Sequence, residues 1–203
     1  MVVRIYGNRP IKTLTGQQTR PTSSKVREAL FNTWQGHIDG CRWLDLCAGS
    51  GAMGAEALCR GAKIVVGIEK LPKACSVIQE NWERIARPEQ SIRVIRGDVA
   101  QKLQTLTDKQ FDRMYFDPPY ASGLYLPVLK AILAKGLLAQ DGEIAVEHDR
   151  DLPLPRNIDI KSVEPTQTQC ASTSDTIATR LTCSRQKQYG RTTLTFYSLT
   201  IAH

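Results

Sequence analysis

The sequence predicts an α/β protein with a doubly wound, mostly parallel sheet. From Arg42 onward, short apolar runs alternate with longer helical stretches, and this spacing lets helices cross over between parallel strands. A glycine-rich turn, Gly49–Gly54, joins the first of these runs to a helix, and acids end several later runs. In such sheets, ligands bind at the carboxyl ends of the strands. We expect one domain of 203 residues, with a basic segment 1–34 attached to a catalytic core 42–203.

The first segment of the chain lacks the signals of a long helix. Gly7, Pro10, Gly16 and Pro21 interrupt it, which predicts short extended pieces or an arm. A helix is expected next, from about Ser23 to Trp34, because hydroxyl side chains are available to cap it. Its apolar residues recur at helical spacing, namely Val26, Ala29, Leu30, Phe31 and Trp34.

The core elements are expected in regular alternation. The predicted strands lie near 42–47, 63–68, 92–96, 112–116 and 143–147, and the predicted helices near 53–60, 71–86, 99–106 and 123–135. Two later segments, 157–163 and 192–199, alternate polar and apolar residues and predict an antiparallel edge. Pro153 and Pro155 exclude helix between 152 and 156. The segment from Thr166 to Cys183 is rich in Thr, Ser and Gln, which predicts a long polar loop.

Composition excludes several classes of protein. An apolar content of 41% with 23% charged residues fits a soluble globular domain, and no apolar run is long enough to span a membrane. The N-terminus lacks the apolar core of a signal peptide, so we expect a cytoplasmic protein. The six cysteines form no C-x-x-C pair and the three histidines are scattered, so we expect no metal site.

The net charge of +7 is concentrated near the N-terminus, where the first acid in the chain is Glu28. Such a block of like charge is typical of proteins that contact phosphate backbones, although a solvated tail would look the same. The candidate RNA-binding residues are Arg4, Arg9, Lys12, Arg20, Lys25 and Arg27.

The glycine-rich turn predicts a nucleotide-type ligand. Its pattern also satisfies the dinucleotide fingerprint, so NAD and S-adenosylmethionine (SAM) are both candidates. Asp45 precedes the turn and favours SAM, because a carboxylate would repel a pyrophosphate and attract the cationic methionine end. Glu69 ends the second strand at the spacing of a ribose-binding acid, and Asp98 ends the third, where it can accept from an adenine amine. The candidate cofactor residues are Asp45, Ala48, Gly49, Gly51, Glu69 and Asp98.

The fourth strand runs into Asp117-Pro118-Pro119-Tyr120, the candidate catalytic residues. The two prolines stiffen the backbone, so the Asp117 carboxylate and the nearby carbonyls form fixed acceptors. An exocyclic aromatic amine offers two matching N–H donors and becomes positively charged as it attacks a methyl group. Tyr120 can stack on the base. A rigid turn before a helix is the alternative.

Taken together, these segments resemble the RsmD-like 16S rRNA (guanine-N2) methyltransferases. The matching segments are Arg4–Gly7, Arg20–Thr22, Val26–Asn32, Leu44–Gly51, Asp117–Tyr120 and Tyr189–Thr192. The resemblance implies a Rossmann-like fold that uses SAM to methylate guanine 966 of small-subunit rRNA. It also implies that the acids and glycines named above hold SAM, that Asp117 to Tyr120 hold the guanine, and that the basic arm grips rRNA. The segment 166–183 is longer than the family pattern leads us to expect.

Three other functions share parts of the pattern. An adenine-N6 DNA methyltransferase shares the catalytic tetrapeptide, an NAD-dependent oxidoreductase shares the glycines and Glu69, and a non-catalytic RNA-binding module would explain the basic arm. We expect small-subunit rRNA, free or within an assembly intermediate, as the partner. We expect a monomer, because no heptad pattern or exposed apolar stripe is present.

Overall fold

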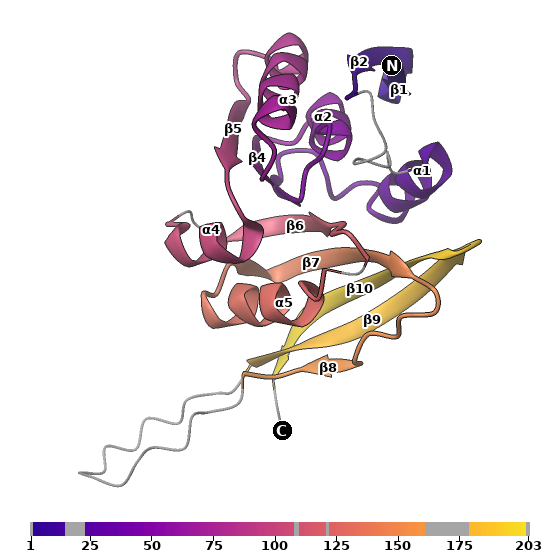
Figure 1. The fold of residues 1–203 in the computed structure, drawn as a ribbon, viewed down its shortest axis with the longest axis vertical. Helices are drawn as coiled ribbons and strands as arrows, with labels where there is room; N and C mark the ends of the chain where they lie inside the picture. Colours follow the sequence, from indigo (N-terminus) through magenta and orange to yellow (C-terminus); the bar gives the residue numbers. More distant parts are fainter. Residues whose placement is uncertain (1, 15–22, 108–109, 121, 161–178, 202–203) are drawn as a thin grey trace, which may run out of the picture.

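An eight-stranded sheet organises the computed structural model, which describes residues 2–14, 23–107, 110–120, 122–160 and 179–201 (Figure 1). The strand order is β5-β4-β3-β6-β7-β10-β9-β8. The parallel strands are β3 (Arg42–Leu46), β4 (Ile64–Glu69), β5 (Ser91–Arg96), β6 (Phe111–Phe116) and β7 (Leu138–Asp149). The antiparallel edge is β10 (Thr192–Ile201), β9 (Thr179–Tyr189) and β8 (Asn157–Ile158). The predicted doubly wound sheet with an antiparallel C-terminal edge is therefore confirmed.

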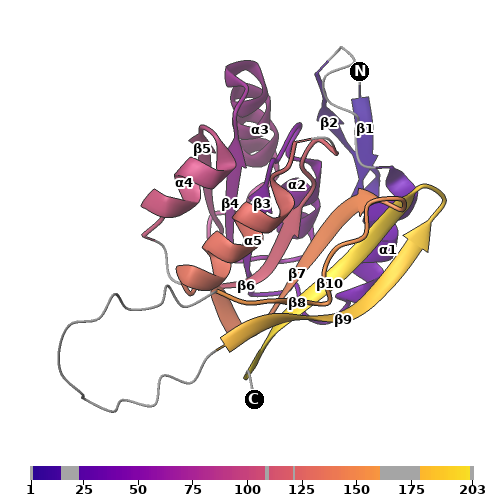
Figure 2. The ribbon, with the colours of Figure 1, turned by 60° about the horizontal axis from the view of Figure 1, so that its bottom comes forward.

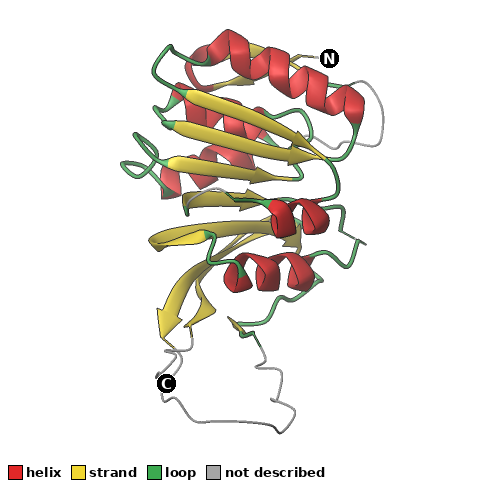
Figure 3. Ribbon diagram, turned by 90° about the vertical axis from the view of Figure 1, so that its left-hand side faces the viewer, coloured by secondary structure: helices red, strands yellow, loops and turns green. Residues whose placement is uncertain are grey.

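Helices cover both faces of the sheet (Figure 3). One face packs against α1 (Ser24–Thr33), α2 (Ala52–Cys59) and α3 (Pro72–Ile85), and the other against α4 (Val99–Thr105) and α5 (Tyr125–Ala134). Side chains alternate between the faces, as a pleated strand requires. In β3, Trp43 joins the core on the α1 side, whereas Leu44 and Leu46 join the core on the α5 side.

The predicted cap of α1 is present, because the Ser23 hydroxyl accepts a hydrogen bond from the Val26 N–H at 3.2 Å. Phe31 stacks on Trp43 with ring centroids 5.3 Å apart. Trp34 follows the helix and donates its indole N–H to Glu143 at 2.6 Å. The apolar stripe of the predicted helix thus packs on the sheet.

The N-terminal segment forms a hairpin of β1 (Val2–Ile5) and β2 (Arg9–Lys12), joined by the short 3-10 helix η1 (Tyr6–Asn8). Ile5 and Ile11 are buried in the same core cluster as α2 and α3. Figure 2 shows the hairpin beside these two helices. The predicted extended pieces are therefore one hairpin whose apolar face is packed on the core.

The C-terminal region differs most from the expectation. The predicted polar loop 166–183 overlaps β9, which begins at Thr179, while its residues 166–178 lie outside the described part of the chain. Along β9 only Leu181 is buried, so the strand shows no apolar alternation. Its extended form follows from pairing with β10, a non-local interaction that a local pattern cannot report. Within the described residues, β8 covers only two residues of the predicted strand 157–163.

Among the described residues, no helix combines the length and the apolar character that crossing a membrane requires.

Candidate active site

Four acids converge at the carboxyl ends of the parallel strands. Burial raises the pKa of the Cys47 thiol, and the negative charges of Glu69, Asp117, Asp45 and Asp98 raise it further. These acids come from β4, from the end of β6, from β3 and from the residue that follows Gly97 after β5. The structure therefore gathers at one edge the acids that the sequence places after separate strands.

Asp45 is buried against the backbone of the glycine-rich turn and does not line open space. Its side chain is 1% exposed and accepts a hydrogen bond from the Gly54 N–H at 3.0 Å. Burial raises the pKa of Asp45, and that hydrogen bond lowers it. A carboxylate here holds the first turn of α2, where helix N–H groups lack intrahelical partners. Its attraction for the methionine end of SAM remains a prediction.

Glu69 connects the glycine-rich turn to the beginning of α3. One carboxylate oxygen accepts from the Gly49 N–H and the other from the Leu71 N–H, both at 2.8 Å. An ionised carboxylate has about four acceptor sites, so it can take these bonds and still receive a hydroxyl. Asp98 caps α4 by accepting from the Ala100 N–H at 3.0 Å. Both acids are thus held in place by backbone hydrogen bonds.

The glycines of the turn serve two different purposes. Gly49 and Gly51 both have positive φ, at +58° and +73°. A Cβ on Gly49 would have no heavy atom within 4 Å, whereas a Cβ on Gly51 would lie 2.8 Å from the indole nitrogen of Trp82. The open side of Gly49, next to the Glu69 carboxylate, suits the adenosine and amino-acid parts of SAM, which offer hydroxyl and ammonium donors. The residues of this turn therefore fit the cofactor.

Alanine substitutions should separate these two purposes. We expect Gly49→Ala to lower the free energy of unfolding by about 1–2 kcal/mol, which is the strain of a residue with a Cβ in the left-handed region. We expect its SAM binding to lose more free energy than its folding does. Gly51→Ala should destabilise the fold more, because its Cβ also meets Ile78 at 3.0 Å. Urea unfolding and SAM titration of both variants measure the two effects. Unchanged SAM affinity in Gly49→Ala would show that the open side of the turn is not the cofactor site.

Two neighbouring residues of α3, which the sequence did not predict as part of the site, hydrogen-bond to the backbone of the turn. The Asn81 amide donates to the Ser50 carbonyl at 3.2 Å and bonds both backbone groups of Lys12 at 2.9 Å. Trp82 donates its indole N–H to the Gly51 carbonyl at 2.8 Å, and both side chains are fully buried. The helical recurrence of Ala74, Ile78, Trp82 and Ile85 marks α3 as a core helix, but no local signal names the turn as its contact.

The candidate catalytic residues follow directly from β6. The Asp117 N–H makes a long, 3.5 Å hydrogen bond to the Leu46 carbonyl, so Asp117 still lies beside the end of β3. Asp117 and Tyr120 are half-buried, Pro118 is buried and Pro119 is exposed. Burial raises the pKa of Tyr125 in α5, and Asp117 and Tyr120 contribute to the shift. The tetrapeptide thus lies next to the acids and the glycine-rich turn.

The candidate RNA-binding residues separate into different environments. Arg4, Arg9 and Lys25 are exposed, Lys12 is exposed and pairs with Glu80, and Arg20 lies outside the described residues. Arg27 corrects the expectation, because it is only 3% exposed and its Nε donates to Glu56 at 2.6 Å. It also donates to the Arg4 carbonyl at 2.7 Å. Arg27 lies on the apolar face of α1, so its side chain points toward the core despite its charge. A buried guanidinium is costly unless it has hydrogen-bond partners, which the Glu56 carboxylate and the Arg4 carbonyl supply.

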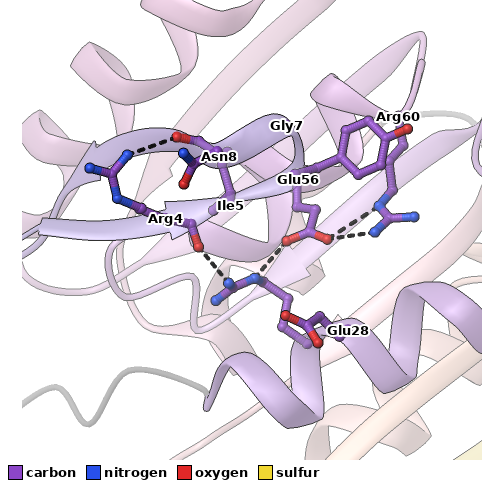
Figure 4. A pocket seen from close by; sticks show the side chains of 9 residues that line it. Arg4, Ile5, Gly7, Asn8, Glu28, Glu56 and Arg60 are labelled. Carbon is purple, nitrogen blue, oxygen red and sulfur yellow. Dashed lines mark hydrogen bonds and ion pairs between the residues drawn. The ribbon is translucent and has the colours of Figure 1, made fainter.

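A pocket of about 340 Å³ surrounds this ion pair, between the hairpin turn and α2 (Figure 4). Figure 4 shows the Glu56 carboxylate bridging two arginines, one of which is Arg60 at 2.8 Å. None of the candidate catalytic or cofactor residues lines it. Within the described part of the chain, no group of His, Cys, Asp and Glu could hold a metal ion.

This chain is similar to known proteins over most of its length. The model of a family described as "Conserved hypothetical protein 95" matches residues 3–171. A Bacillus subtilis protein named "Putative rRNA methyltransferase YlbH" is 34% identical over 152 residues, which cover 74% of this chain and 82% of that protein. "Ribosomal RNA small subunit methyltransferase D" of Haemophilus influenzae is 28% identical over 155 residues, 76% of this chain and 80% of that protein. The solved structure of "Putative methyltransferase yhhF from Escherichia coli" has a TM-score of 0.77, 25% identity and full coverage of both chains.

Proposed function

This chain belongs to the RsmD-like family described as conserved hypothetical protein 95, and on that basis we propose that it methylates the exocyclic N2 of a guanine in small-subunit rRNA. It is a SAM-dependent methyltransferase, and its relatives are rRNA methyltransferases. We take guanine 966 as the target from the family resemblance. The NAD-dependent oxidoreductase and the non-catalytic module lose their support, since the relatives are methyltransferases.

One observation supports the proposal most strongly: Asp117 to Tyr120 lie at the same strand edge as Glu69 and the glycine-rich turn. The cofactor supplies an electrophilic methyl group whose bonding electrons stay with its sulfur. The guanine amine forms the new C–N bond and becomes positively charged, so the Asp117 carboxylate stabilises it electrostatically. Asp117 orients the amine rather than acting as a strong base, because the proton becomes acidic only after the methyl group has moved. That proton then leaves to solvent.

The target base must leave its helix before it can reach this edge, because a stacked or paired amine is shielded. We propose that Tyr120 stacks on the flipped base and holds it in position. The exposed Arg4, Arg9 and Lys25 are the residues that we propose contact phosphates. Action on free rRNA or an assembly intermediate, a monomeric state and a cytoplasmic location stay predictions.

Arg9 and Arg27 should behave differently when replaced. We expect Arg9→Ala to weaken rRNA binding and to reduce the slope of log affinity against log salt by about one, with stability unchanged. Arg27→Met should keep that slope and lower stability by somewhat less than the roughly 3–5 kcal/mol of a broken buried pair, because Arg60 still pairs with Glu56. Filter binding across salt concentrations and urea unfolding measure both. A reduced slope in Arg27→Met would restore Arg27 as an RNA contact.

The test of the function is methyl transfer from radiolabelled SAM to small-subunit rRNA from cells that lack this protein. The rRNA is supplied both isolated and within partly assembled particles, and the labelled nucleosides are then identified. N2-methylguanosine supports the proposal, whereas N6-methyladenosine would overturn the choice of base. Label in the particles but not in isolated rRNA would identify an assembly intermediate as the substrate.

A further inference from the structure

Asp117 directly follows β6, and Glu147 lies one residue beyond the last β7 residue that pairs with β6. The β6–β7 register pairs Tyr115 with Ala145 and Phe116 with Val146, so the next step sets Asp117 opposite Glu147. Tyr115 and Ala145 belong to the core on the α1 side, and alternation returns Asp117 and Glu147 to that side. Neighbouring strands are about 4.8 Å apart, so the two acids begin from adjacent points of one edge.

The Glu147 carboxylate has a defined position. The Tyr115 hydroxyl donates to its Oε2, and the two side chains are only 2% and 5% exposed. The Tyr125 hydroxyl donates to the Glu147 backbone carbonyl at 3.3 Å. Burial raises the pKa of Tyr125, and the negative charges of Asp117 and Glu147 raise it further, so both charges lie near the same end of the sheet. A buried carboxylate fixed in this way can impose a strict hydrogen-bonding requirement on what reaches it.

Guanine offers donors that match two neighbouring carboxylates. Its N1–H and its N2 amine present N–H groups side by side in one plane, whereas adenine has an unprotonated acceptor at N1. The two N–H bonds of an amine diverge, so their acceptors lie roughly 5 Å apart when each bond is about 2.9 Å. That separation is close to the spacing of adjacent strands.

We propose that Glu147 selects guanine, accepting hydrogen bonds from N1–H and from one N2–H while Asp117 accepts the other N2–H. This inference rests on the proposed guanine-N2 function and supplies a physical reason for the choice of base. Adenine would set its N1 lone pair against a buried carboxylate, which is strongly unfavourable. Tyr115 is then a positioning residue that orients the Glu147 carboxylate.

The test uses an rRNA fragment with either guanine or 2-aminopurine at the target position. 2-Aminopurine keeps the N2 amine but has an unprotonated N1. Single-turnover methyl transfer by the wild-type protein should favour guanine by about 100-fold or more. Glu147→Gln should lower that ratio to within about tenfold and raise the rate on 2-aminopurine above wild type, because its amide can donate to N1.

Glu143→Gln is the matched control, since Glu143 precedes Glu147 by four residues on β7 and contacts Trp34 and Arg185 instead. It should keep the wild-type ratio. Tyr115→Phe should reduce the ratio about tenfold with SAM affinity unchanged, and it replaces Glu147→Gln if that variant does not fold. If Glu147→Gln lost methyl-transfer rate equally on guanine and 2-aminopurine, Glu147 would have a structural role only. The same would follow if the ratio of the two rates were unchanged in both Glu147→Gln and Tyr115→Phe. A wild-type protein inactive on guanine would instead overturn the proposed function itself.

Discussion

Replacing Asp117 with alanine should lower the rate of methyl transfer about 100-fold or more while SAM still binds. The carboxylate lies at the end of β6, where it can stabilise the charge that develops on the attacking amine. Removing one group of this kind typically costs about 10²–10³ in kcat. The cofactor contacts proposed for the glycine-rich turn and Glu69 do not depend on it, since their hydrogen bonds join Gly49, Glu69 and Leu71.

Single-turnover kinetics and calorimetric titration with SAM measure these two effects separately. Asp141→Ala is a suitable control, because Asp141 is exposed near the beginning of β7, away from the carboxyl ends of the strands. It should keep both the wild-type rate and the wild-type affinity. If Asp117→Ala lost SAM binding as severely as it lost turnover, Asp117 would belong to the cofactor site.

Replacing Trp82 with alanine should lower the free energy of unfolding by about 3–5 kcal/mol, the usual cost of deleting a fully buried aromatic side chain. The indole fills space that glycines leave open: a Cβ on Gly54 or Gly67 would lie 2.3 Å or 2.6 Å from it. The glycine-rich turn would lose both this packing and the hydrogen bond to Gly51. We therefore expect SAM affinity to fall as well, measured at a temperature where the variant remains folded.

Ile85→Ala separates a general loss of stability from a loss of support for the turn. Ile85 is buried on the same helix, near its end, and its truncation should cost about 2–5 kcal/mol without changing SAM affinity. Trp82→Phe should be milder than Trp82→Ala, because a six-membered ring remains and only the N–H and part of the indole volume are lost. Wild-type SAM affinity in Trp82→Ala would mean that the turn keeps its shape without the indole.

Most of the core was predictable because its signals are local. The alternation of apolar runs and helical stretches gave the parallel strands closely, except that β7 begins at Leu138 rather than near 143. The acids at the end of β4 and just after β5 and β6 followed from position alone. β9 was not predictable, because its polar residues become a strand only through pairing with β10. Arg27 was placed among the RNA contacts by its charge, whereas its position on the buried face of α1 decides its role.

The sequence by itself determined the doubly wound sheet, the family and the identity of the acids and glycines at the strand ends, because periodicity and motif spacing are properties of neighbouring residues. Only the tertiary structure decided which glycine is open to a ligand and which is filled by Trp82, and which arginine is exposed. It alone gave the β6–β7 register from which Asp117 and Glu147 are inferred to be neighbours. These features depend on strand register and on packing between segments far apart in the chain, and no local pattern encodes them.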